Sequence, residues 1–132
     1  MNRALVLTGL AACALVVAGP AQAAPGDMSA AGFLAKYDAL RAKGMAALLS
    51  SDAKLLRSEA TAAGQAVRAQ RLADKAAGRP PTSCPPGKVN LSAQQLVAHL
   101  NSYPAEQRPR ITLKRAIAEW MTRTYPCRAG AS

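Results

Sequence analysis

The chain has 132 residues, with 17 Lys and Arg against seven Asp and Glu, and its formal net charge is +10. This length predicts one small domain. Cys84 and Cys127, which lie far apart in the sequence, and the single His99 are too few for a zinc site with the usual four ligands, because Cys13 falls in an N-terminal segment that is expected to be removed. The positive charge favours anionic partners, although simple solubility explains it equally well.

The first 23 residues have the features of a secretory signal peptide. The positive start Met1-Asn2-Arg3 precedes an apolar run over residues 4–18, and Ala21-Gln22-Ala23 is a small-x-small cleavage site. We expect cleavage after Ala23, which leaves residues 24–132 with a net charge of +9. A retained membrane anchor is the alternative, but the apolar run is shorter than the roughly 20 residues that span a bilayer.

The same segment also contains a possible lipobox, Leu10-Ala11-Ala12-Cys13, in which Cys13 would be acylated and become the first mature residue. The apolar residues 14–17 that follow Cys13 count against this interpretation. Intact-mass analysis distinguishes an N-terminal Ala24 from a lipidated Cys13. Both routes predict a periplasmic or secreted protein, a location that disfavours nucleic acid as the partner.

The first half of the mature chain predicts a helical hairpin over residues 30–78. Residues 24–29 have the composition of a flexible N-terminus, and Ser29 can cap a first helix over residues 30–49. A second helix is expected over residues 52–77, because Gly78 and the prolines after it stop a helix. This helix is rich in alanine, so we expect it to pack antiparallel to the first helix and to stay half exposed.

Basic residues of the second predicted helix fall near one face, at spacings of 3, 11, 3 and 4. They are Lys54, Arg57, Arg68, Arg71 and Lys75. A solvated helix face is one interpretation, and a docking stripe for an acidic partner is the other. No aromatic residues interleave with them, so stacking on nucleic-acid bases is unsupported.

The second half begins with a stiff, proline-rich linker over residues 79–91 and continues with a helix pair over residues 92–127. Ser92 and Gln95 fit a capping box for a third helix over residues 93–102. After a polar link over residues 105–110, Thr112 can cap a fourth helix over residues 113–124, and residues 128–132 form a tail. The expected fold is therefore all-α, with four helices in one domain.

Cys84 and Cys127 are the two cysteines that remain after signal-peptide cleavage, and in an oxidising compartment they allow a single disulfide. The pair would join the end of the fourth helix to the segment before the third. It would close a loop of about 44 residues, which contributes on the order of 4 kcal/mol in the chain-entropy description.

The residues do not indicate an enzyme. His99 is the only histidine and lies near the apolar side of the third helix, where a structural role is expected. The seven acidic residues are scattered singly, so no carboxylate pair for hydrolysis is recognisable. No phosphate-binding loop or metal-ligand cluster is present in the sequence, and we expect no cofactor. Trp120 lies in an apolar stripe and is expected to pack in the core.

The stretch from Cys84 to Cys127 resembles the Tai/Rap family of type VI secretion amidase immunity proteins. The matching elements are Cys84-Pro85-Pro86-Gly87, Gln95-Leu96-Val97, Tyr103-Pro104 and Tyr125-Pro126-Cys127, in that order. The family positions that carry over are structural: Cys84, Pro86, Gly87, Leu96, Pro104, Pro126 and Cys127. The first half departs from the family, because residues 24–83 lack a second cysteine pair and contain a long, basic, alanine-rich helix.

The resemblance implies a small exported protein that blocks a peptidoglycan amidase by occupying its active-site cleft, often as a homodimer. In that case the basic helix face would contact the enzyme together with Arg108, Arg110, Lys114 and Arg115. The alternative is an envelope-associated structural protein that contacts anionic lipid or polymer through its charge and has no immunity role.

Overall fold

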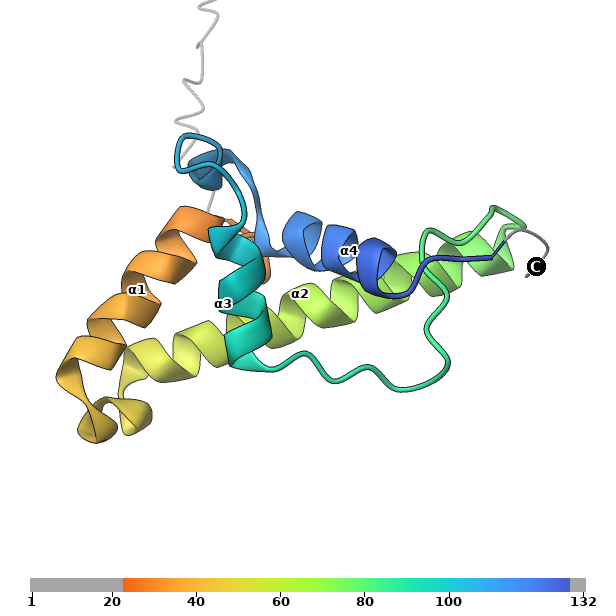
Figure 1. Cartoon of the computed structure of the whole chain (residues 1–132). Coiled ribbons are helices and arrows are strands. Elements are labelled where there is room, and N and C mark those ends of the chain that lie inside the picture. The colour runs from red at the N-terminus through yellow and green to blue at the C-terminus, as the bar shows by residue number, and fades with distance from the viewer. Residues whose placement is uncertain (1–22, 129–132) are drawn as a thin grey trace, which may run out of the picture.

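The computed structural model describes residues 23–128, which form an all-α fold with no β-strand in this range (Figure 1). Its four α-helices are α1 (Ala30–Lys43), α2 (Ser51–Ala76), α3 (Ala93–Asn101) and α4 (Leu113–Thr124). Two 3-10 helices join them, η1 (Met45–Leu49) and η2 (Arg108–Arg110). The predicted signal peptide up to residue 22, Cys13 and the tail from residue 129 lie outside the described residues.

The predicted first helix over residues 30–49 is wrong in its second part. α1 ends at Lys43 because Gly44 adopts φ +74°, a left-handed conformation that interrupts the helix. Residues 45–49 then form η1, and Ser50 caps α2 by accepting a hydrogen bond from the Ala53 amide. The predicted cap of α1 is confirmed, since the Ser29 side chain accepts from the Gly32 amide.

The C-terminal end of α2 has the predicted glycine stop. Gly78 has φ +70°, and its amide donates to the Lys75 carbonyl at 3.1 Å. The Arg79 amide donates to the Asp74 carbonyl at 2.9 Å, which completes a Schellman motif. In the second half, the capping box of Ser92 and the Thr112 cap are both present, and α4 has the predicted bounds.

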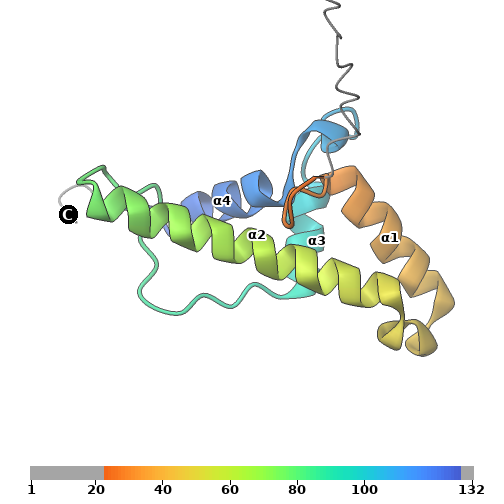
Figure 2. The ribbon, with the colours of Figure 1, turned by 180° about the vertical axis from the view of Figure 1, so that it is seen from behind.

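α1 and α2 form an open V that meets at η1, and α3 and α4 occupy the space between them (Figures 1 and 2). A closely packed antiparallel hairpin was therefore the wrong expectation. α4, not α1, runs beside the C-terminal half of α2. α2 is rich in alanine, and its small side chains leave room for a neighbouring helix to approach closely.

The core lies where the four helices converge. Leu100 of α3 and Leu113 at the start of α4 are fully buried, and each such leucine contributes about 1.5–3 kcal/mol relative to an exposed one. Other buried apolar side chains come from all four helices: Phe33, Leu34, Leu56, Leu96, Ile117 and Met121. Trp120, expected in the core, is only partly buried and packs at its edge.

Residues 24–29 are held against the domain, contrary to the expected flexible segment. Glu59 of α2 accepts hydrogen bonds from the amides of Gly26 (2.8 Å) and Met28 (3.3 Å). Asp27 forms an ion pair with Lys114 at 2.9 Å. The chain then forms a single antiparallel bridge between Ser29 and Thr112, so that the start of α1 is joined to the start of α4.

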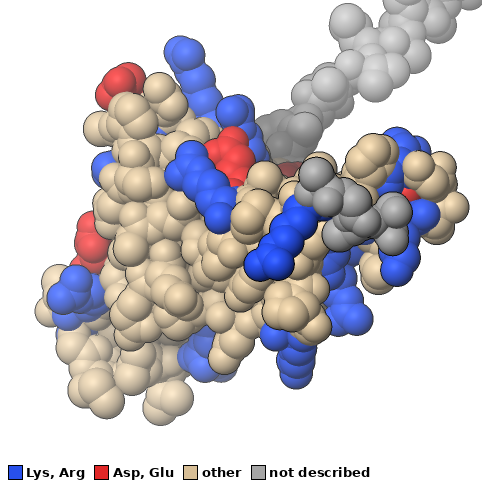
Figure 3. Space-filling model, turned by 45° about the vertical axis from the view of Figure 1, so that its right-hand side comes forward, with Lys and Arg blue, Asp and Glu red and all other residues tan. Residues whose placement is uncertain are grey.

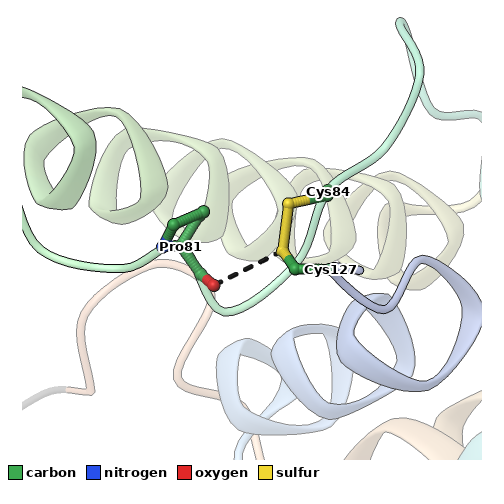
Figure 4. Close-up of a disulfide and its surroundings, with 3 residues drawn as sticks. All are labelled: Pro81, Cys84 and Cys127. Atoms are coloured by element: carbon green, nitrogen blue, oxygen red, sulfur yellow. Dashed lines mark hydrogen bonds between the residues drawn. A yellow bond between two sulfur atoms is a disulfide. The ribbon is translucent and has the colours of Figure 1, made fainter. Parts of the chain in front are cut away.

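The predicted disulfide between Cys84 and Cys127 is present, with a Cα–Cα distance of 4.9 Å (Figure 4). The Cys84 amide also donates to the Tyr125 carbonyl at 2.8 Å. Cys127 Sγ lies 3.5 Å from the Pro81 carbonyl oxygen, a contact without a proton because the disulfide sulfur carries none. These contacts fix the first part of the proline-rich linker beside the segment that follows α4.

Candidate binding groove

Lys and Arg side chains are spread over the face of the molecule in Figure 3, among few Asp and Glu. The basic residues predicted on one face of α2 differ in their exposure and in the contacts that they make. Lys54, Arg68 and Lys75 are exposed and form no ion pair within residues 23–128. Arg57 donates instead to the carbonyls of Leu48 (2.8 Å) and Ala53 (3.4 Å), so its guanidinium supports η1.

The four further predicted contact residues are divided between two places. Arg108 donates to the carbonyls of Tyr103 and Asn101, both at 2.9 Å, and so closes the end of α3. Lys114 pairs with Asp27, and Arg115 pairs with Glu119 at 2.9 Å. Arg110 is exposed on η2. The nine predicted cations therefore do not form one continuous docking surface.

A groove of about 820 Å³ runs between α2, the end of the linker, and the facing sides of α3 and α4. Its apolar lining comes from all of these segments: Val67, Leu72, Val89, Leu91, Leu96, Ile117, Trp120 and Met121. Arg68, Arg71 and Lys88 supply its charge, and none of the residues that line it is Asp or Glu. Such a groove suits an anionic group attached to an apolar body.

Sequence reasoning placed Arg68 and Arg71 in the basic stripe but missed Lys88 and the groove itself. Lys88 lies in the linker, which passes beside α2 and contributes to the groove lining. Trp120 lines the groove and packs edge-to-face against Tyr125, with ring centroids 5.9 Å apart. The feature of the sequence that could have indicated this role is Lys88 itself, a charged residue within the proline-rich linker.

A smaller hollow of about 440 Å³ lies on another side of the contact between α2 and α4. Val67 and Arg71 line both spaces, and Lys114 and Arg115 line this one. Because the carboxylates of Asp27 and Glu119 pair with these two α4 cations, the smaller hollow is less positive than its lining suggests.

His99 belongs to a buried polar network outside both grooves. Its Nε2 lies 2.9 Å from the Ala116 carbonyl oxygen and 3.1 Å from the Tyr103 hydroxyl. A carbonyl only accepts, so Nε2 carries the proton, while the Tyr103 hydroxyl donates to Glu119 at 2.5 Å. Arg115 donates to the other oxygen of Glu119. The network joins α3 to α4, which agrees with the structural role expected for His99.

The environment of this network shifts the pKa of its members. Burial, opposed by the hydrogen bond with Ala116, lowers the pKa of His99 and favours neutral imidazole. Burial, followed by the hydrogen bond to Glu119, raises the pKa of Tyr103 to about 12. The hydrogen bonds from Tyr103 and then Arg115 lower the pKa of Glu119. At neutral pH, Glu119 is therefore the only charged acceptor among these groups.

Comparisons with models of known protein families, with curated proteins and with solved structures found no match to this chain. The described residues contain no group of three or more His, Cys, Asp or Glu side chains that could hold a metal ion. In the same range no helix is long and apolar enough to cross a membrane.

Proposed function

We propose that this is an exported binding protein that neutralises a secreted cell-wall hydrolase of the amidase type by steric and electrostatic blockade. The observation that carries the proposal is the groove, which combines an apolar lining and Trp120 with Arg68, Arg71 and Lys88. The resemblance of residues 84–127 to amidase immunity proteins supplies the class of partner.

The chemistry of the groove supports a protein partner. Interface centres are enriched in Trp and Arg, with apolar contact area inside and polar groups at the rim. An acidic loop of the partner that carries an apolar side chain would match both parts of the groove. The net charge of +9 in residues 24–132 would speed association with an acidic enzyme surface.

The positions that carry the resemblance support the groove indirectly. Cys84 and Cys127 hold the linker beside α4, and Gly87 is itself among the lining residues. Leu96 belongs both to the motif and to the groove lining, where it is buried. We infer that the motif builds the wall of the groove, while residues of α2 supply the charge specific to this protein.

The test is affinity isolation of partners from the secretome of competing, toxin-delivering cells, with identification of each bound protein. The double variant Arg68→Glu/Arg71→Glu reverses the groove charge. The matched control, Lys54→Glu/Lys75→Glu, changes the same helix by the same charge outside the groove lining. Recovery of a cell-wall hydrolase by the wild type and the control, but not by the groove variant, is the expected result. Recovery of no hydrolase by the wild type contradicts the proposal.

A second candidate function is contact with anionic lipid or polymer of the cell envelope. It is favoured by Lys54, Lys75 and Arg110, which are exposed and have no ion-pair partner in the described part of the chain. Such binding would be lost at moderate salt, because exposed charges are screened beyond a Debye length of about 8–10 Å. Binding that does not change with salt would contradict it.

A further inference from the structure

The end of the molecule where α1 meets α2 exposes a contiguous group of large apolar side chains. Met45 is 81% exposed, Leu49 is 84% exposed and Leu48 is 53% exposed. The segment Gly44-Met45-Ala46-Ala47-Leu48-Leu49 contains no polar side chain. Single exposed leucines are common on soluble proteins, but three large apolar residues at one projecting end need an explanation. We call Met45, Leu48 and Leu49 the apolar tip.

The apolar tip is held in place by its own hydrogen bonds. The Ala47 amide donates to the Gly44 carbonyl at 3.1 Å, and the Ser50 amide donates to the Ala47 carbonyl at 3.0 Å. Arg57 of α2 donates to the Leu48 carbonyl at 2.8 Å. Ala47 is buried beneath the tip, with 5% of its surface exposed. The tip is therefore a preformed projection whose large side chains point away from the core.

Basic residues surround the apolar tip on both helices. Arg41 and Lys43 precede it in α1, and Lys54 and Arg57 follow it in α2; all four are exposed. The acidic residues in the same stretch are Asp38 and Asp52, and Asp52 is paired with Lys36 at 2.8 Å. Residues 36–57 carry five basic and two acidic side chains, a net charge of +3.

We propose that the apolar tip inserts into the interfacial layer of an anionic bilayer, with the basic residues of its two helices against the lipid headgroups. An exposed apolar surface next to Lys and Arg is the combination that binds reversibly at such an interface. A second copy of this chain is the poorer occupant, because a symmetric contact would place two clusters of charge +3 against each other. An anionic lipid surface complements both the apolar and the charged part.

This inference does not depend on the groove, and it gives the envelope contact a defined site. Figures 1 and 2 place η1 at one end of the molecule and the end of α2 at the other. Leu55 and Arg68 are separated along α2 by about 20 Å at 1.5 Å per residue. A protein bound through its apolar tip would therefore keep the groove above the headgroups and free for a partner.

The experiment is vesicle sedimentation of the protein recovered after export, once its N-terminus has been established by intact mass. Vesicles of phosphatidylglycerol are compared with vesicles of phosphatidylcholine. The test variant is Met45→Ser/Leu49→Ser, and the control is Leu72→Ser, because Leu72 is also exposed (51%) but lines the groove of α2 away from the tip, so that it separates insertion of the tip from lipid binding in the groove. A third variant, Lys43→Gln/Lys54→Gln, removes two charges and leaves the tip intact.

The wild type and Leu72→Ser are expected to bind phosphatidylglycerol vesicles in a salt-sensitive manner. The affinity of Met45→Ser/Leu49→Ser for these vesicles should be lower by a factor of about ten or more, because two inserted side chains are lost. Lys43→Gln/Lys54→Gln should weaken binding and its salt dependence. The proposal is overturned if the tip variant binds like the wild type, which would leave general charge as the cause. It is equally overturned if the wild type does not bind but forms a dimer that the tip variant abolishes.

Discussion

The Tyr103 hydroxyl donates a hydrogen bond of 2.5 Å to Glu119 and lies 3.1 Å from Nε2 of His99. Tyr103 follows α3 and Glu119 lies in α4, so this contact joins the two helices of the disulfide-linked half. His99 also packs edge-to-face on the Tyr103 ring, with centroids 5.1 Å apart. The Nε2 atom and the ring of His99, the only histidine of the sequence, thus make their contacts within the fold, away from the groove.

Substitution Tyr103→Phe should lower the free energy of unfolding by about 1–3 kcal/mol. The variant keeps the ring but leaves Oε2 of Glu119 without its donor, while Arg115 still donates to Oε1, and an unsatisfied partly buried acceptor atom carries this cost. Urea unfolding followed by circular dichroism measures the change. Tyr37→Phe is the control, because no hydrogen bond of the Tyr37 hydroxyl is found among the described residues. An equal loss of unfolding free energy in both variants would contradict this prediction, because the loss would then not depend on the contact with Glu119.

Stability should fall as the pH decreases from 7.5 to 5.5. The pKa of His99 is lowered in the folded protein, so the unfolded chain, with a pKa near 6.5, binds a proton first. Protonation therefore favours unfolding as the pH falls below about 6.5, and the stability lost there returns at higher pH. Unfolding titrations at both pH values should show this decrease in the wild type. His99→Gln should flatten it, and an unchanged pH dependence in that variant would contradict the assignment.

Removal of the disulfide should destabilise the protein by on the order of 4 kcal/mol, from the loop that the bond closes in the unfolded chain. The double variant Cys84→Ser/Cys127→Ser is compared with the wild type by thermal unfolding, with and without reductant. The variant should melt at a lower temperature, and reductant should lower the melting temperature of the wild type alone. A wild type that melts at the same temperature with reductant would show that the bond contributes little.

Two glycines, Gly26 and Gly64, should respond in opposite directions to replacement by alanine. Gly26 has φ +89°, and a Cβ there would lie 2.7 Å from the Ala63 amide nitrogen, so Gly26→Ala should cost about 1–3 kcal/mol or more. Gly64 lies inside α2 with open space around it, so Gly64→Ala should stabilise by roughly 0.5–1 kcal/mol. Chemical unfolding of both variants tests the pair. A neutral Gly26→Ala would mean that the N-terminal segment is not held as described.

Local signals in the sequence were sufficient for much of the fold. Ser29, Ser92 and Thr112 cap helices as predicted because N-capping depends only on a few neighbouring residues. The cysteine pair could be predicted because only one pairing was available. Gly44 lowers the helix propensity of residues 30–49, but whether such a glycine bends or ends a helix depends on packing that a single sequence does not contain.

The groove and the apolar tip could not be predicted, because both depend on how distant segments meet. Lys88 and Arg68 are 20 positions apart in the sequence, and the linker brings them to the same groove. Leu48 continues the apolar helical spacing of Phe33, Tyr37 and Leu40, yet after the turn at Gly44 it is exposed to solvent. The hydrogen bonds from Arg57 and Arg108 to backbone carbonyls could not be predicted from the sequence either.

The most direct test of the central claim is inhibition of a cell-wall hydrolase by this protein. The hydrolase recovered in the affinity experiment is assayed on purified peptidoglycan with increasing amounts of wild type, Arg68→Glu/Arg71→Glu or Met45→Ser/Leu49→Ser. We predict stoichiometric inhibition by the wild type and the tip variant, and loss of inhibition in the groove variant. Full hydrolysis in the presence of excess wild-type protein, or inhibition that survives reversal of the groove charge, would contradict the account.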